Sequence, residues 1–459
     1  MPVSYAQERL WFIEQLDRGK GVYNIPVVLR LRGALDVVSL ERTLTEIVRR
    51  HEALRTVFRV EGGEAVQVIK PAGRFRLEVE EVSGEGAHEK EEEARRKAEE
   101  EVRRGFDLEE GPLMRVMVYR VGEEEHVVAV TMHHIISDGW SMGVMVREVG
   151  ELYEAYRKGE ESPLKELEIQ YADYAAWQRE WLRGEELEKQ MSYWRKQLDG
   201  APVVLELPFD RPRPAEQSYR GSSEPVFINR QLTAGLKRLC RGEAATLYMT
   251  LLGGFFTLLY RYTRQVEILV GTPIAGRSHE QTEGLIGLFV NTLVMRGDMT
   301  GNPTFREFLH RVSEMSLSAY AHQDLPFDLL VEELHPERSL SYSPIIQVMF
   351  SLDQAKSKAV EIADLELGGM SIPVETSKFD LMLLMTESKD VIQGSLVYST
   401  DLFDAPTISR MISHLERLLA SIVSNPDARL DELEMLSYEE SALLEEAIEI
   451  EDLNESFLF

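Results

Sequence analysis

The sequence predicts an α/β fold with two lobes of unequal length. Segments of helical period alternate along the chain with short apolar runs that are typical of strands. A stretch rich in Pro, Arg and Ser, residues 207–225, is predicted to be an extended connection, and the second half repeats the general rhythm of the first. We place the first lobe at residues 1–175 and the second at 176–432. Residues 433–459 are expected to form an acidic linker cut from a longer chain.

The bulk composition excludes several classes of protein. Of the 459 residues 44% are apolar, which is enough for large buried cores. A net charge of −28 argues against a nucleic-acid partner, because phosphate binding needs basic patches. The single cysteine, Cys240, excludes an intrachain disulfide and a multi-cysteine metal cage. The most apolar run, Leu247 to Tyr260, is shorter than the roughly 20 residues that a membrane-spanning helix needs, so we expect a cytoplasmic protein.

The first lobe is predicted to alternate helices and strands. Apolar residues at Leu40, Leu44 and Ile47 recur with helical period, and Ser39 is a candidate N-cap. Opposite charges spaced four apart predict a solvated helix at 89–104. The later elements are strands at 112–121 and 126–134, which are joined by the turn 122–125, and a helix that begins at Ser141.

The second lobe is predicted from the same kinds of pattern. A buried helix at 247–260 precedes an apolar strand-like run at 266–277. The further expected elements are a helix at 305–322, a break at 322–330, strands at 344–352 and 392–400, and a final amphipathic helix at 408–423.

The stretch "TMHHIISDGWSM", residues 131–142, holds the candidate chemistry. It follows a nearly continuous apolar run, so we expect a strand buried on both faces, on which His133 and His134 point to opposite sides. Gly139 permits a tight turn, and Ser141 can cap the next helix. Asp138, beside buried backbone, needs a cation or several hydrogen-bond donors.

Two plainer interpretations of this stretch stay open on these residues alone. Both histidines could be satisfied core residues, with Asp138 capping a turn. His134 and Asp138 could also ligate a metal, but the sequence has no second ligand cluster, so no metal site is predicted.

"HHIISDG" resembles the H-H-x-x-x-D-G signature of condensation domains of nonribosomal peptide synthetases, which are relatives of chloramphenicol acetyltransferase. Further stretches resemble the other motifs of the family in the same order, over about residues 4 to 435: "SYAQERLWFIEQLDRGKGVYNIP", "RHEALRTVF", "VGTPIAGR", "IGLFVNTLVMR", "HQDLPFDLLVEEL" and "YSPIIQVMF". The resemblance implies two chloramphenicol-acetyltransferase-like lobes in a V-shaped pseudo-dimer, with a tunnel between them that is open at both ends.

The same resemblance implies an amide-forming acyltransferase. In that family the α-amine of an acceptor aminoacyl thioester attacks the thioester carbonyl of a donor aminoacyl or peptidyl group. The two substrates arrive on the 4′-phosphopantetheine arms of an upstream and a downstream peptidyl carrier protein, and the domain itself binds no cofactor. An adjacent adenylation domain is an expected partner, and the excised domain is expected to be a monomer without nucleic-acid or membrane partners.

Carried over by motif, the resemblance implies a role for each residue of the central stretch. His134 is the active-site histidine, and His133 is the packed one. Asp138 is structural and is expected to pair with Arg277 of "GTPIAGR". The backbone N–H of Gly139 could face the reacting carbonyl.

Five further residues are assigned more loosely. Asn291 of "FVNT" is expected near the tunnel on the substrate side. Trp140 is a second candidate for substrate binding, although packing explains it as well, and Arg9 is expected to form an ion pair. "RPRPAEQSYR", with Arg211 and Arg213, is a candidate basic patch for carrier docking, against the alternative of a solvated linker.

His134 is expected to accept a hydrogen bond from the attacking amine and a proton as the tetrahedral intermediate forms. Positioning of two tethered substrates contributes about 7–11 kcal/mol and so could outweigh proton transfer. "SYAQERLWF" and "YNIP" resemble the subclass with an L-configured donor and an L-configured acceptor. The alternatives are a stand-alone CoA-dependent acyltransferase and a catalytically silent domain that only docks carrier proteins.

Overall fold

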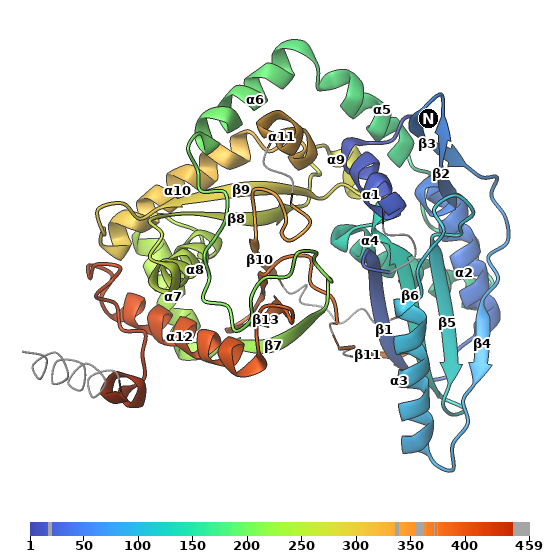
Figure 1. Ribbon diagram of the computed structural model, residues 1–459. Coiled ribbons are helices and arrows are strands. Elements are labelled where there is room, and N and C mark those ends of the chain that lie inside the picture. The colour runs from blue at the N-terminus through green and yellow to red at the C-terminus, as the bar shows by residue number, and fades with distance from the viewer. Residues whose placement is uncertain are drawn as a thin grey trace, which may run out of the picture.

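The computed structural model describes residues 1–16, 21–335, 339–354, 362, 364–370, 372–373 and 375–443. It contains two lobes, each with a mixed sheet, flanking helices and a hydrophobic core (Figure 1). Helices α5 (Tyr171–Trp181) and α6 (Gly184–Leu198) run across the top of the view from the N-terminal to the C-terminal lobe. The predicted α/β fold with two lobes is confirmed.

The N-terminal lobe is organised around a five-stranded sheet. In spatial order the strands are β11 (Glu366–Gly369), β1 (Asn24–Arg32), β6 (Glu125–His133), β5 (Met114–Arg120) and β4 (Glu78–Glu81). All neighbours pair antiparallel except β4 and β5. Val127 and Ala129 of β6 pack into one core, and Val128 packs into the other. The prediction of a strand buried on both faces is therefore confirmed.

Helices cover both faces of this sheet, and two of them begin at a different cap from the one predicted. α3 (Ala87–Arg103) packs on one face, and α2 (Val37–Arg50) and α4 (Gly139–Arg157) pack on the other. The N-caps are Asp36 and Asp138, not Ser39 and Ser141. Both aspartates accept from backbone N–H groups of the first turn, where a carboxylate also interacts favourably with the helix dipole.

The C-terminal lobe holds a six-stranded sheet. In spatial order the strands are β7 (Gly221–Ile228), β13 (Val391–Ser399), β12 (Leu381–Ser388), β10 (Val348–Gln354), β8 (Glu267–Ile274) and β9 (Asn291–Asp298). The helices that share its core are α6, α7 (Arg230–Gly242), α8 (Leu247–Thr263), α10 (Phe305–Ala321), α11 (Phe327–Leu334) and α12 (Ala405–Ser424). Within the described residues no single helix is long and apolar enough to cross a membrane, and α7 and α8 pass that test only as a pair bent by 107°.

Two segments of the C-terminal half cross into the N-terminal lobe. The loop 275–290 between β8 and β9 buries four side chains in the N-terminal core, namely Leu285, Ile286, Leu288 and Phe289. β11 continues the N-terminal sheet by pairing with β1, so that Leu31 faces Leu367. The remaining elements are α1 (Tyr5–Leu16), the hairpin of β2 (Thr56–Glu61) and β3 (Glu64–Ile69), and α9 (Glu280–Glu283).

The first residues of the predicted tail at 433–459 contact the C-terminal lobe. Leu433 is 1% exposed, and its carbonyl accepts from Arg261 Nη1 at 2.7 Å. Glu440 Oε1 lies 3.0 Å from His414 Nε2 on α12. The chain therefore stays packed on the lobe beyond residue 433, and residues 444–459 lie outside the described residues. The division at residues 175 and 176 stays a prediction.

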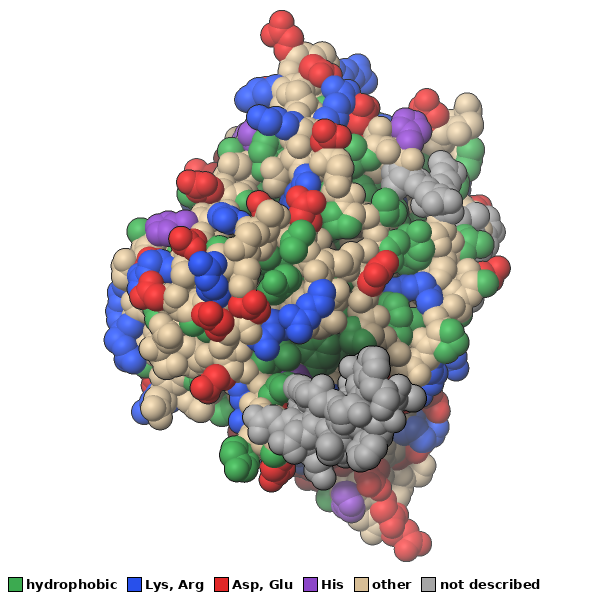
Figure 2. All heavy atoms as spheres, turned by 60° about the vertical axis from the view of Figure 1, so that its left-hand side comes forward, with side chains coloured by type: hydrophobic (Ala, Val, Ile, Leu, Met, Phe, Trp, Pro, Cys, Tyr) green, Lys and Arg blue, Asp and Glu red, His purple; other side chains and the backbone are tan. Residues whose placement is uncertain are grey.

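The basic residues of the connection 207–225 are matched by acidic partners inside the C-terminal lobe. The Arg211 guanidinium pairs with Asp404, and Arg213, which is 16% exposed, pairs with Asp380. Figure 2 shows one face of the molecule, on which acidic and basic side chains are interspersed and hydrophobic ones gather near the centre. Both arginines thus form ion pairs within the lobe, Arg213 buried and Arg211 about half exposed, and a docking role for this segment stays a prediction.

Candidate active site

A cavity of about 460 Å³ lies between the two lobes. Its lining includes Arg9, Tyr23 and His134 from the N-terminal half. Asn291, Lys378 and Met382 are among the residues that line it from the C-terminal half. The cavity therefore brings together two of the residues predicted for the site, His134 and Asn291.

The two adjacent histidines have different environments. β6 ends at His133, and His134 is the first residue of the one-turn 3₁₀ helix His134–Ile136. The two side chains therefore point in different directions because the backbone changes from strand to helix between them, and not only because side chains alternate along a strand. His133 is 1% exposed, its Nδ1 accepts from Ile135 N at 3.1 Å, and its ring packs near Tyr23 and Phe106. His134 is only partly buried and lines the cavity.

One hydrogen bond determines the tautomer of His134. Its Nδ1 lies 2.8 Å from the carbonyl oxygen of Ser137. A carbonyl can only accept, so Nδ1 carries the proton and Nε2 is left as an acceptor. Burial, and secondly the positive charge of Lys378, lower the pKa of His134 to about 4. The imidazole is therefore neutral at physiological pH and can accept a hydrogen bond from a bound group.

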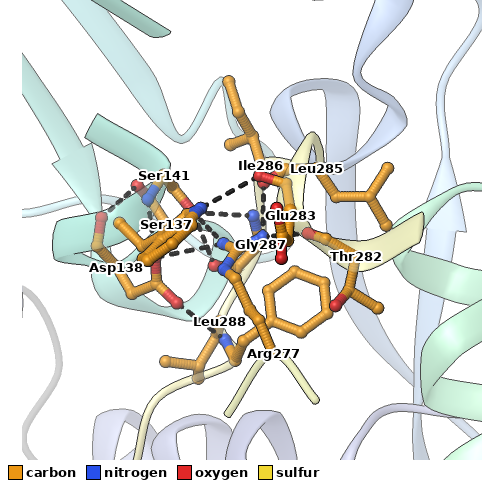
Figure 3. A network of polar contacts seen from close by, with 12 residues as sticks. Ser137, Asp138, Ser141, Arg277, Thr282, Glu283, Leu285, Ile286, Gly287 and Leu288 are labelled. Carbon is orange, nitrogen blue, oxygen red and sulfur yellow. Dashed lines mark hydrogen bonds and ion pairs between the residues drawn. The ribbon is translucent and has the colours of Figure 1, made fainter. Parts of the chain in front are cut away.

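Asp138 anchors the turn that follows His134 (Figure 3). Its Oδ1 accepts from Ser141 N at 2.8 Å and lies 3.3 Å from Arg277 Nη2. Its Oδ2 accepts from Phe289 N at 3.0 Å. The buried carboxylate thus has both the cation and the donors that its position demands.

Arg277 ties the crossing loop 275–290 to the start of α4. Its Nη2 donates to Ser141 Oγ at 2.9 Å, and its Nη1 donates to the carbonyl oxygens of Leu285, at 2.8 Å, and Thr282. The guanidinium also lies over the Phe289 ring, 4.0 Å from the centroid. These contacts hold the turn that carries His134 from the side of the other lobe.

Gly139 and Trp140 lie in the first turn of α4. Within the described residues the cavity lining includes neither of them. Gly139 has ordinary helical backbone, and a Cβ added there would meet no heavy atom within 4 Å. The backbone at this position therefore does not depend on glycine, and the role of its N–H toward a substrate stays a prediction. Trp140 is 42% exposed, and its indole N–H donates to the Glu283 carbonyl at 2.9 Å.

Asn291 lies at the cavity with its amide already engaged. Its Nδ2 donates to the carbonyl oxygens of Gln323, at 2.9 Å, and Leu325, at 2.8 Å. Its Oδ1 accepts from Phe327 N at 3.0 Å. The side chain thus fixes the break before α11, and its role toward a substrate stays a prediction.

Three lining residues complete the polar surface near His134. Arg9 on α1 pairs with Asp328 on α11 at 2.9 Å, which links the two lobes. Neither Tyr23 nor Lys378 was predicted as a site residue: Tyr23 lies in the motif stretch "YNIP" but was given no role of its own, and Lys378 lies in no quoted motif. In the part of the chain that the structure describes, no three or more His, Cys, Asp and Glu side chains are grouped to hold a metal ion.

Solved structures of the same fold cover nearly the whole chain. The X-domain from teicoplanin biosynthesis superposes with a TM-score of 0.87 at 30% identity, covering 95% of this chain and 97% of that one. The first condensation domain of the CDA synthetase gives a TM-score of 0.79 at 20% identity, covering 95% and 98%.

Sequence comparison gives the family. One linear gramicidin synthase protein of Brevibacillus parabrevis is 47% identical over 446 residues, which make up 97% of this chain and 9% of that relative. A second protein of the same synthase is 49% identical over 442 residues, 96% of this chain and 6% of that relative, so the chain spans less than a tenth of either. A family model described as Condensation domain matches residues 1–445. The chain belongs to the condensation-domain family of nonribosomal peptide synthetases.

Proposed function

We propose that this domain forms a peptide bond between two substrates held as thioesters on phosphopantetheine arms of carrier proteins. The acceptor α-amine attacks the donor thioester carbonyl beside His134. The observation that carries this proposal is the His134 imidazole, which lines a cavity between the lobes with Nδ1 bound to the Ser137 carbonyl and Nε2 free to accept. Membership of the condensation-domain family supports the same reaction class.

His134 acts in this proposal mainly by positioning the amine. An imidazole whose conjugate acid has a pKa of about 4 is a weak base. An α-amine, with a pKa near 8, is already partly neutral at physiological pH. Alignment of two tethered reactants contributes about 7–11 kcal/mol, whereas general-base assistance contributes about 10²–10⁴-fold. The Nε2 acceptor therefore orients the N–H of the nucleophile and leaves its lone pair facing the carbonyl.

The wider arrangement is part of the proposal. The cavity is taken as the middle of a tunnel between a first lobe at 1–175 and a second at 176–432, with one carrier docking at each mouth. The donor and the acceptor are both L-configured, and an adenylation domain adjoins the domain in its parent synthetase. The backbone N–H of Gly139 is a candidate donor to the oxyanion, and Asn291 and Trp140 are candidate substrate contacts.

One observation favours a second function, that of a silent docking domain. The X-domain of teicoplanin biosynthesis, which shares this fold at a TM-score of 0.86 and 30% identity, is known in complex with OxyB. Binding of another protein is thus a use of the fold that needs no reaction at the histidine.

Reconstitution with two chemically loaded carrier proteins separates these functions. We expect the wild-type domain to produce a dipeptidyl thioester on the acceptor carrier, measured by intact mass. His134→Ala should lower the rate by about 10²-fold, because the attacking amine is no longer oriented. His88→Ala, an exposed histidine on α3, serves as the matched control and should leave the rate unchanged. Carrier binding without any dipeptidyl product would establish the docking function, and equal transfer from an acyl-CoA to a free amine would establish a stand-alone acyltransferase.

A further inference from the structure

Lys378 stands in the segment that leads into β12, and its backbone is held on both sides. Ser377 N donates to the Tyr219 carbonyl at 2.9 Å. Gln217 Nε2 donates to the Lys378 carbonyl at 3.2 Å, and Asp380 pairs with Arg213. The fixed backbone delivers the Lys378 side chain to the cavity that His134 lines from the opposite lobe.

The ammonium of Lys378 has no carboxylate partner among the described residues. Its Nζ lies over the Tyr23 ring, 4.1 Å from the centroid. The nearby Arg9 differs, because Asp328 neutralises it at 2.9 Å. A partly buried cation without a counter-ion is costly, and at the wall of the cavity that His134 also lines it provides a site for negative charge.

The charged and titratable groups around Lys378 come from several elements. Those that line the same cavity are Arg9 on α1, Tyr23 before β1, His134 after β6, Tyr174 on α5, Tyr219 before β7, Asp324 before α11, Asp328 on α11, and Tyr342 before β10. Burial raises the pKa of Tyr23 to about 12, so the phenol stays neutral. Burial, and secondly Arg9, lower the pKa of Lys378 to about 8. Lys378 therefore titrates in an accessible range, and its charge also acts on His134.

We propose that Lys378 is a catalytic residue whose ammonium binds the oxyanion that forms on the donor carbonyl. This inference rests on the proposed peptide-bond formation. The amine lone pair forms the new C–N bond while the carbonyl π electrons move to oxygen, where the Lys378 ammonium holds them. The intermediate then re-forms the carbonyl and breaks the C–S bond. The pantetheine thiolate leaves and takes up the proton that the amine nitrogen releases.

The same positive charge acts on the nucleophile. A cation in the cavity disfavours an ammonium next to it, so it lowers the pKa of the acceptor amine and raises the neutral fraction. It also keeps His134 neutral. Lys378 thus binds the oxygen of the reacting carbonyl, and His134 orients the attacking nitrogen.

The test uses carriers loaded with donor and acceptor, and measures kcat and KM of dipeptidyl-thioester formation from about pH 6.5 to 9.5. In the wild type the rate should rise as the acceptor amine deprotonates and fall again as Lys378 loses its charge above about pH 8. Lys378→Arg keeps the charge at every pH, so its profile should lack the falling limb. Lys378→Met should lower kcat by about 10²-fold, with KM for the carriers unchanged.

Lys189→Met on α6, an exposed lysine, is the matched control for the loss of one charge. A Lys378→Met enzyme with wild-type kcat, or a Lys378→Arg enzyme that keeps the falling limb, would overturn the proposal while leaving peptide-bond formation intact. If Lys378→Met does not fold, as judged by circular dichroism, the Lys378→Arg profile decides alone. A wild-type domain that makes no dipeptidyl product would instead refute the proposed function itself.

Discussion

Each lobe contains a strand–turn–helix unit of the same length. Only the unit of the N-terminal lobe has a histidine, His134, that lines the cavity. In the N-terminal lobe β6 ends at His133, and Asp138 caps α4 five residues later. In the C-terminal lobe β13 ends at Ser399, and Asp404 stands at the N-cap of α12 at the same spacing. Each strand also pairs antiparallel with the strand before it, β5 or β12.

The two units differ in the residue at the turn and in the burial of the N-cap aspartate. Thr400 stands where the first unit has His134, and Ala405 stands where it has Gly139. The Asp138 carboxylate is buried against Arg277, whereas the Asp404 side chain is 52% exposed and pairs with Arg211. A strand, a turn and an acidic N-cap therefore make a stable corner in either lobe. The reactive potential comes from the imidazole and from the cavity next to it.

The largest expected effect on the rate comes from replacing His134 by threonine, the residue at the equivalent position of the second unit. His134→Thr should lower dipeptide formation by about 10²-fold, because the Nε2 acceptor that orients the amine is lost. Thr400→Ala should change it by no more than about twofold. The measurement is the single-turnover rate with loaded carriers. Equal losses in the two variants would mean that the units are not functionally distinct.

The two aspartates should differ in their effect on stability. Asp138→Ala leaves the buried Arg277 guanidinium without its carboxylate and should lower the free energy of unfolding by about 3–5 kcal/mol. Asp404→Ala removes a half-exposed ion pair and should cost about 1 kcal/mol or less. Urea unfolding followed by circular dichroism measures both. Similar costs would contradict the contrast in burial.

Acid should weaken the first unit through His134, whereas Thr400 in the second unit carries no ionisable group. Burial holds the pKa of His134 at about 4 in the folded chain, against 6.5 when the chain is unfolded. Between these values the unfolded state binds the extra proton, so stability falls as the pH drops from 6.5 to about 4. His134→Gln should lose less unfolding free energy over this range than the wild type. Parallel curves would show that His134 is protonated in the folded protein.

The smallest effect is expected at the glycine that follows Asp138. Gly139→Ala gives the first unit the alanine of the second, in a helical conformation with open space around the new Cβ. It should raise the free energy of unfolding by about 0.4–1 kcal/mol, because it lowers the entropy of the unfolded chain. The backbone N–H is retained, so dipeptide formation should persist. A stable variant without activity would show that substrate occupies the space next to residue 139.

Local sequence patterns predicted the long elements well. The helix expected at 305–322 is α10, Phe305–Ala321, and the one expected at 408–423 is α12, Ala405–Ser424. Their periodicity is a local property, and Thr304 with Glu307 adds a capping box. The pairing of Asp138 with Arg277 joins residues 139 positions apart, and only the family resemblance pointed to it.

The elements that were missed depend on contacts between distant segments. β12 reads "LMLLMTES", a run of apolar residues whose alternating burial is hidden by the uniform hydrophobicity. β11 reads "ELGG", which has low strand propensity and becomes a strand by pairing with β1 of the other lobe. Lys378 was missed for the same reason, because an isolated lysine gives no sign of the cavity that distant segments build around it.

The pairing of β11 with β1 ties the second half of the chain to the sheet of the first lobe. A chimera that joined the first lobe of one parent to the second lobe of another would bring together a β1 and a β11 that never co-evolved. Poor pairing would expose the backbone amides and carbonyls of β1 as an edge open to aggregation. Recombination sites are therefore better placed outside the whole domain than between its halves.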